Sequence, residues 1–125
     1  MTMQPRILKH QPDAGYYTEE RCFINELCNS DDDTAVSIAE ARVLVDECTR
    51  WHRLEGITER YVIITGTGRV EVGDLPAQEV KPGDVVLIPP GCRQRIRNTG
   101  HADLVFLAIC SPRFEQRLYE DIEPG

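Results

Sequence analysis

The 125-residue sequence contains no apolar run long enough to cross a bilayer. A spanning helix needs about 20 apolar residues, whereas the longest run here, Leu104–Cys110, has seven. Residues 1–15 lack the apolar segment of a secretory signal peptide. The five cysteines are odd in number and include no C-x-x-C pair. We therefore expect a cytoplasmic protein whose thiols are reduced.

Positive charge is also scarce. The chain has 14 Lys and Arg against 21 Asp and Glu, which gives a formal net charge of −7 and a pI near 4.9. Nucleic-acid binding depends on clustered Lys and Arg, and an acidic surface is repelled by anionic lipid. The composition therefore argues against nucleic acid and membrane partners.

Long amphipathic helical patterns are missing, and short β-branched segments take their place. Gly- and Pro-containing turns separate segments at about 36–45, 49–54, 59–65, 68–73, 77–80, 84–88, 92–97 and 103–110. Strands at this spacing predict an antiparallel sandwich or barrel. The alternation over Cys22–Ile24 predicts an edge strand. Residues 1–15 are predicted to form an arm, and residues 111–125 either a short helix or an arm packed on a neighbour.

Two blocks within Trp51–Asn98 carry regularly spaced polar and glycine residues. They resemble the paired motifs of the cupin superfamily, G-x5-H-x-H-x(3,4)-E-x6-G and G-x5-P-x-G-x2-H-x3-N. The positions that match are His52, Glu59, Gly66, Gly83, Pro89, Gly91 and Asn98. The resemblance implies an all-β, double-stranded β-helix barrel of jelly-roll type, with a short N-terminal arm and a short C-terminal helix or tail. We expect one domain over residues 1–125, with the barrel core at about 36–110.

The chain departs from these motifs at three positions. Asp46 stands at the leading glycine, Leu54 at the second histidine and Gln94 at the histidine of the second block. In cupins, three histidines and a glutamate hold a divalent metal inside the barrel. The resemblance thus leaves His52, Glu59 and Gln94 as candidate ligands for Fe, Mn, Ni, Cu or Zn. Gln94 offers only a neutral amide oxygen, and Leu54 has no donor atom at all.

The site has two interpretations at this point. Either a weakened divalent-metal site remains, or no metal binds and His52 and Glu59 act as acid/base groups. Gln94 is then a metal ligand or a hydrogen-bond partner of the substrate. Residues of one strand parity face the same side of a sheet, so Tyr61 shares the side of Glu59. Its hydroxyl either orients a ligand or belongs to an ordinary core aromatic residue.

Two further residues are candidates for substrate binding. Arg42 either reaches into the barrel and binds a substrate carboxylate, or lies on the surface in an ion pair. Cys110 either faces the pocket or is a small buried core residue, as free cysteines usually are.

We therefore predict a small-molecule-binding cupin with two alternative functions. In the first, it is an enzyme that acts on a small polar organic substrate through His52 and Glu59. In the second, it is a non-catalytic module that binds or senses a ligand without metal. A homodimer formed through the N-terminal arm or an edge strand is also predicted, because an unpaired strand edge needs covering.

Overall fold

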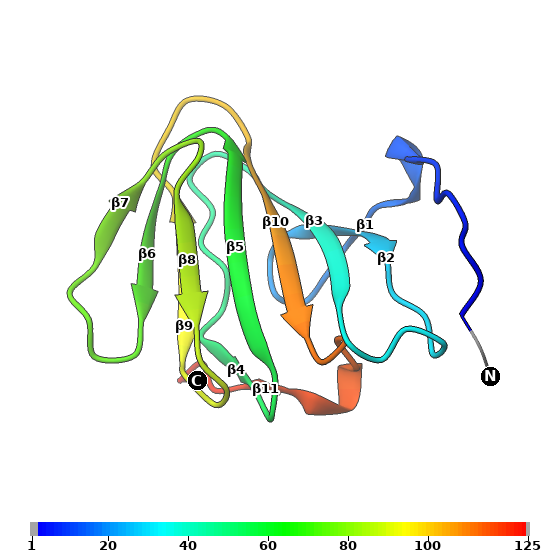
Figure 1. Cartoon of the computed structure of the whole chain (residues 1–125). Helices are drawn as coiled ribbons and strands as arrows, with labels where there is room; N and C mark the ends of the chain where they lie inside the picture. The colour runs from blue at the N-terminus through cyan, green and yellow to red at the C-terminus, as the bar shows by residue number, and fades with distance from the viewer. Residues whose placement is uncertain (1–2, 125) are drawn as a thin grey trace.

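The computed structural model describes residues 3–124 and confirms the predicted all-β architecture (Figure 1). Two antiparallel sheets face each other, and buried side chains fill the space between them. The strands are β1 (Tyr16–Tyr17), β2 (Phe23–Cys28), β3 (Ser37–Val43), β4 (His52–Leu54), β5 (Thr58–Thr65), β6 (Gly68–Val72), β7 (Gln78–Val80), β8 (Val85–Ile88), β9 (Gln94–Asn98), β10 (Leu104–Ser111) and β11 (Tyr119–Asp121). Two 3₁₀ turns, Pro12–Ala14 and Gln116–Leu118, complete the described elements.

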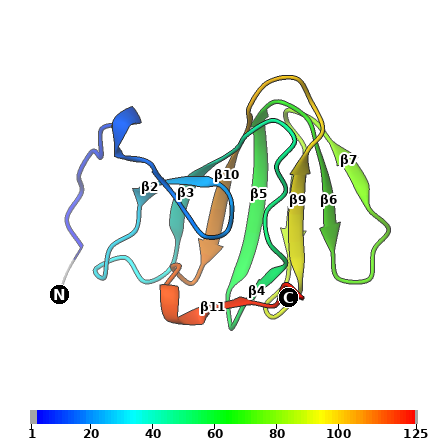
Figure 2. The same cartoon turned by 180° about the vertical axis from the view of Figure 1, so that it is seen from behind.

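The two sheets differ in size and do not close on each other. The larger sheet has the strand order β1-β2-β3-β10-β5-β8, and the smaller has the order β11-β4-β9-β6-β7. Figures 1 and 2 show them from opposite sides, with the larger sheet in front in Figure 1. No strand within residues 3–124 pairs across the gap between β8 and β7 or between β1 and β11. The predicted barrel is therefore corrected to an open pair of facing sheets with the jelly-roll order of strands.

Side-chain alternation along the strands creates the core. On β5, Glu59, Tyr61 and Ile63 are buried, whereas the residues between them lie on the outer face. The same alternation on β8 and β10 buries Ile88 and Phe106. Because side chains of one parity share a face, the motif residue Glu59 and its neighbour Tyr61 point into the space between the sheets.

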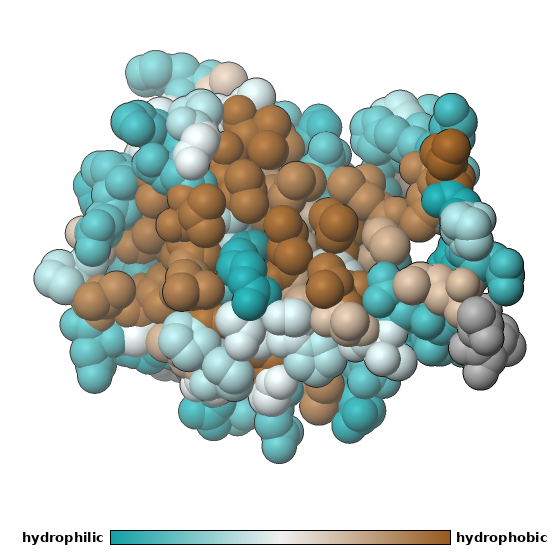
Figure 3. Space-filling model, in the orientation of Figure 1, coloured by the Kyte–Doolittle hydropathy of each residue, from teal (hydrophilic) through white to brown (hydrophobic). Residues whose placement is uncertain are grey.

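The outer face of the larger sheet is unusually apolar. Figure 3 shows apolar side chains gathered over β5, β8 and β10. Among them Ile64, Val85 and Leu87 are 45%, 61% and 63% exposed. Strand pairing places Val62 beside Val85 on one side and beside Leu107 on the other. We call this surface, formed by Val62, Ile64, Val85, Leu87, Val105, Leu107 and Ile109, the outer apolar face.

The turn residues explain why the motif glycines stand where they do. Gly66 has a φ of +84°, and an added Cβ would lie 2.6 Å from the carbonyl oxygen of Asp103. Asp46, which replaces the leading glycine of the first motif, has a φ of +68°. Aspartate is one of the few non-glycine residues that adopt this left-handed conformation readily. The substitution therefore keeps the backbone geometry that glycine would have provided.

Near the two ends of the chain, the predicted edge strand is wrong and the tail contains both a short helical turn and a strand. The strand predicted over Cys22–Ile24 is part of β2, which is not an edge, since β1 pairs with its outer side. The C-terminal residues form a 3₁₀ turn followed by β11, and β11 pairs with β4 of the same chain. The predicted core of residues 36–110 thus omits three strands that join the sheets. No helix among residues 3–124 is long and apolar enough to cross a membrane.

Candidate functional site

A cavity of about 600 Å³ lies against the inner face of the larger sheet. Its other walls come from the turn after β1 and from the C-terminal residues that lead into β11. The side chains that line the cavity include Tyr16, Tyr17, Glu19, Glu20, Glu26, His52, Leu54, Glu59, Tyr61, Phe106, Cys110, Phe114, Tyr119 and Asp121. Ligand pockets commonly have volumes of about 300–1,000 Å³. The cavity is therefore large enough for a small organic molecule.

His52 enters this cavity from β4 with a defined orientation. Its side chain is buried, and Nδ1 lies 2.7 Å from the carbonyl oxygen of Arg50. A carbonyl oxygen only accepts hydrogen bonds, so Nδ1 carries the proton and donates it. In the neutral ring Nε2 then has a free lone pair, and it lies 3.7 Å from Oε2 of Glu20. The ring also stacks on Tyr119, with 5.2 Å between the centroids.

Glu59 enters the same cavity from β5 and has an unusual environment. Its side chain is buried, and Oε1 has no hydrogen-bond partner among residues 3–124. Burial raises the pKa of this carboxyl group from 4.5 to about 7, an increase that Glu20 reinforces and that His52 and Gln94 oppose. A group with a pKa near 7 exchanges its proton readily at neutral pH. Glu59 is therefore suited to both give and take a proton.

Gln94 lies behind the cavity and connects to Glu59. It stands opposite His52 in the pairing of β4 with β9, and it is fully buried. The hydroxyl of Tyr61 donates a hydrogen bond to Gln94 Oε1. Gln94 Nε2 has no partner in the described part of the chain, yet the amide is near enough to lower the pKa of Glu59. Gln94 is thus placed to orient the carboxyl group rather than to line the cavity.

The two remaining candidates have different positions. Arg42 is exposed on the outer side of β3, where its guanidinium lies 3.5 Å from the carboxylate of Asp103. Of the two alternatives for Arg42, the structure shows the surface ion pair, because its neighbours Ala41 and Val43 take the inward positions of this strand. Cys110 is buried and lines the cavity. Burial and the nearby Glu59 raise the pKa of its thiol, so the thiol is neutral at physiological pH.

Sequence analysis missed Glu20 and Tyr119. Glu20 belongs to the turn between β1 and β2, where Arg21 has a φ of +72°. Tyr119 lies on β11, in a segment whose apolar residues have helical spacing in the sequence. No motif marks Glu20. The period-two pair Tyr119 and Asp121 was the available signal that the tail forms a strand.

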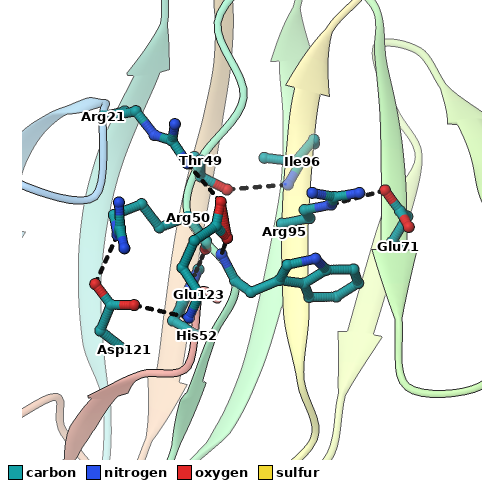
Figure 4. Close-up of polar contacts among 10 residues, drawn as sticks. Arg21, Thr49, Arg50, His52, Glu71, Arg95, Ile96, Asp121 and Glu123 are labelled. Carbon is teal, nitrogen blue, oxygen red and sulfur yellow. Dashed lines mark hydrogen bonds and ion pairs between the residues drawn. The ribbon is translucent and has the colours of Figure 1, made fainter. Parts of the chain in front are cut away.

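The chain's C-terminal region holds β4 in place through several ion pairs and hydrogen bonds (Figure 4). Asp121 lies 2.6 Å from the guanidinium of Arg50, and Glu123 lies 2.8 Å from that of Arg21. The second oxygen of Glu123 accepts a 2.7 Å hydrogen bond from the backbone N–H of Trp51. Two of these contacts are made by Arg50 and Trp51, the residues immediately before His52, and the third ties Glu123 to the β1–β2 turn. They fix the strand that carries the imidazole.

The donor set does not fit the metal centre that the family resemblance implies. Residues 3–124 contain no group of three or more His, Cys, Asp or Glu side chains that could hold a metal ion. Gln94 Oε1 already accepts the Tyr61 hydroxyl, and Leu54 lines the cavity without a donor atom. One imidazole and one carboxyl group are fewer than the three protein ligands usual for a catalytic zinc. No chemical step is therefore assigned to a metal.

Comparison with known proteins agrees with the fold. The family model described as "Cupin domain" matches residues 41–110. An uncharacterized protein of Methanocaldococcus jannaschii is 34% identical over 110 residues, which cover 86% of this chain and 85% of that protein. Facing sheets with this strand order and a matching family model define a double-stranded β-helix protein. The chain belongs to the cupin domain family.

Two solved structures show the same fold at low sequence identity. The predicted oxalate decarboxylase of Thermotoga maritima has a TM-score of 0.76 and 22% identity, covering 86% of this chain and 99% of its own. The polyketide cyclase RemF of Streptomyces resistomycificus has a TM-score of 0.77 and 18% identity, covering 98% and 88%. At these identities the likeness concerns the fold alone. The function must be argued from this chain's own cavity.

Proposed function

We propose that this cupin is an enzyme that moves a proton on a small polar organic molecule, with His52 and Glu59 as the acid/base pair. The observation that carries the proposal is the unpartnered, buried Oε1 of Glu59 in the same cavity as His52. An unpaired buried carboxyl oxygen costs free energy unless a ligand or function uses it. Carboxyl groups with such raised pKa values concentrate at functional sites.

The geometry assigns complementary roles to the two residues. In its neutral form His52 holds a proton on Nδ1, so Nε2 accepts a proton from the substrate. Glu59, in its protonated form, returns a proton to a second atom of the same molecule. Each group then exchanges its proton with water or product, and the enzyme is restored with no net change in protons. Isomerisation and elimination both follow this pattern.

Neighbouring residues support these roles. Tyr119 stacks on the imidazole, and the Arg50 carbonyl sets its tautomer. Gln94, held by the Tyr61 hydroxyl, limits how far the carboxyl pKa rises. The buried setting removes competing water and strengthens each electrostatic contact. Arg42 has no role in this scheme, since its side chain lies on the other face of the sheet.

Solvent-isotope exchange tests the proposal across a range of candidate substrates. A panel of small hydroxy and keto compounds is incubated with the protein in D₂O, and NMR detects carbon-bound deuterium. Replacing His52 or Glu59 with Gln is expected to reduce exchange by about 10²- to 10⁴-fold, the usual contribution of a general acid or base. Glu79→Gln, on an exposed carboxylate of β7, serves as the control. Exchange that survives both site substitutions would refute the assignment.

A non-catalytic ligand-binding module is the second candidate. The observation that favours it is the aromatic character of the cavity walls, where Tyr16, Tyr17, Phe106 and Phe114 supply binding surface without chemical reactivity. In this case His52→Gln weakens ligand binding, and no compound of the panel exchanges its protons. The isotope experiment therefore separates the two candidates.

The homodimer remains a prediction, and the outer apolar face is the surface we propose for it. Contiguous exposed apolar side chains on a soluble protein mark interaction sites. Closed two-fold dimers are the commonest soluble assembly, and their interfaces are self-complementary. Apolar contact is well suited to join two copies that each carry a formal charge of −7, since it does not require opposite charges to meet.

A further inference from the structure

The charge of the cavity is one-sided. Five acidic side chains line it, namely Glu19, Glu20, Glu26, Glu59 and Asp121, and no Lys or Arg is among the described residues of the lining. Among residues 3–124, only Asp121 of this set has a guanidinium partner, Arg50, at 2.6 Å. His52 Nε2 lies 3.7 Å from Oε2 of Glu20. A ligand that enters the cavity therefore meets an excess of negative charge.

One of these acidic side chains, Glu59, is buried rather than exposed on the surface. Glu59 is 8% exposed, and its Oε1 has no hydrogen-bond partner within residues 3–124. A buried carboxyl oxygen without a donor is complementary to a ligand that brings one. Glu19 and Glu26 stand on other parts of the lining, in the β1–β2 turn and on β2. Carboxyl oxygens that can accept hydrogen bonds thus occur at both the buried and the exposed parts of the cavity.

The remaining lining is aromatic and aliphatic. Aromatic rings come from both the larger sheet and the chain's two terminal regions, as Tyr16, Phe106, Phe114 and Tyr119 illustrate. Ring faces attract cations, and carboxylates pair with them directly. An anionic ligand would be repelled by the carboxylates and would find no guanidinium or ammonium among the described lining residues. Aromatic walls combined with carboxylates favour a cationic ligand.

We propose that the cavity selects an organic cation, an amine attached to a largely apolar carbon skeleton, and rejects carboxylates and phosphates. This inference rests on the proposed function for its site and adds the charge of the substrate. The amine binds the carboxylates near the β1–β2 turn, and the apolar skeleton lies along the aromatic wall. Oxalate, a dianion, has the opposite charge from the ligand that this cavity fits.

Binding of three probes of similar size and different charge tests the inference. Phenethylamine, 2-phenylethanol and 3-phenylpropionate are titrated into the full-length protein at pH 7.5, and binding is followed by ligand-observed NMR. We expect the amine to bind at least about tenfold more tightly than the alcohol, and the carboxylate not to bind at about 10 mM. Added salt weakens amine binding, because the contacts are ionic and partly exposed.

Variants locate the interaction. Glu26→Gln and Glu19→Gln should each weaken phenethylamine binding by about three- to tenfold, a change suited to a partly exposed ion pair. Glu79→Gln, which lies on the smaller sheet and outside the lining, should leave binding unchanged. The inference is overturned if the amine does not bind at about 10 mM, if the alcohol or carboxylate binds equally well, or if the cavity variants behave like Glu79→Gln.

Isotope exchange in D₂O, measured on a panel extended to amines and carboxylates, separates this inference from the catalytic proposal. Amine-selective binding without any proton exchange supports the cation site and refutes catalysis by His52 and Glu59. Exchange of an anionic compound that depends on His52 and Glu59 refutes the cation site and supports catalysis.

Discussion

Replacing Glu59 with Gln should make the folded protein more stable at alkaline pH. The carboxyl group has a pKa of about 7 in the folded state, against 4.5 for the ordinary group, because burial disfavours its charged form. Between these values the folded state binds more protons than the unfolded state. The free energy of unfolding therefore falls as pH rises from about 4.5 through 7. Glutamine is neutral at every pH and removes this loss.

The size of the effect follows from the two pKa values. Each pKa unit corresponds to about 1.4 kcal/mol, so the rise from 4.5 to about 7 amounts to roughly 3 kcal/mol. The free energy of unfolding of the wild type should fall by most of this amount between pH 5 and pH 8, whereas that of Glu59→Gln should not fall for this reason. The pH-dependent difference vanishes at low pH by this reasoning, because both side chains are then neutral.

Urea denaturation at pH 5, 6, 7 and 8 measures the difference directly. The free energies of unfolding of wild type and Glu59→Gln should diverge above pH 5, with the variant higher at pH 8. Glu79→Gln on β7 should parallel the wild type throughout, because its carboxylate is 60% exposed. Curves for Glu59→Gln and wild type that stay parallel from pH 5 to 8 would refute the argument that burial raises this pKa.

Three further predictions concern the backbone, assembly and metal content. Gly66→Ala should lower the free energy of unfolding by about 3 kcal/mol or more, against about 1–2 kcal/mol for Gly91→Ala. Both glycines have positive φ, but only at Gly66 would a Cβ contact backbone atoms, so equal losses in urea denaturation would contradict the steric argument. Light scattering of the wild type should give twice the 14.2 kDa chain mass. Leu87→Glu, on the outer apolar face, should give the mass of a monomer, whereas Leu75→Glu, outside that face, should remain a dimer. A wild-type monomer would refute the dimer. Elemental analysis of dialysed, untagged protein should show no stoichiometric metal, since the donor set is too small. Near-stoichiometric Fe, Mn, Ni, Cu or Zn that is lost in His52→Ala would overturn that conclusion.

The central sheets were predictable because their signals are local. Alternation on β5 and the glycine spacing around it place Glu59 and Tyr61 on the inner face, as the structure confirms. For Arg42 the same rule left two positions open, because the sequence alone does not show which parity of β3 faces inward; the burial of Ala41 and Val43 decides for the surface. A shift of one residue in the alternation exchanges the inward-facing and outward-facing side chains of a strand.

The cavity itself could not be predicted, because its walls come from segments distant in sequence. Glu20 and Tyr119 approach His52 only after β1–β2 and β11 have joined the two sheets. Neither segment belongs to the motif blocks, and the spacing of apolar residues in the tail left a short helix and an extended arm both open. The absence of lysine and arginine among the described lining residues is likewise a property of the assembled cavity.

The pairing of β11 with β4 has a consequence for how the protein is made. On the ribosome, β4 emerges long before Tyr119–Asp121, so the strand that carries His52 lacks one of its two neighbours during most of synthesis. The stacked tyrosine and the Arg50–Asp121 ion pair arrive last. A nascent chain can thus assemble its central strands first, and it acquires the complete cavity only when residue 121 has emerged from the ribosome.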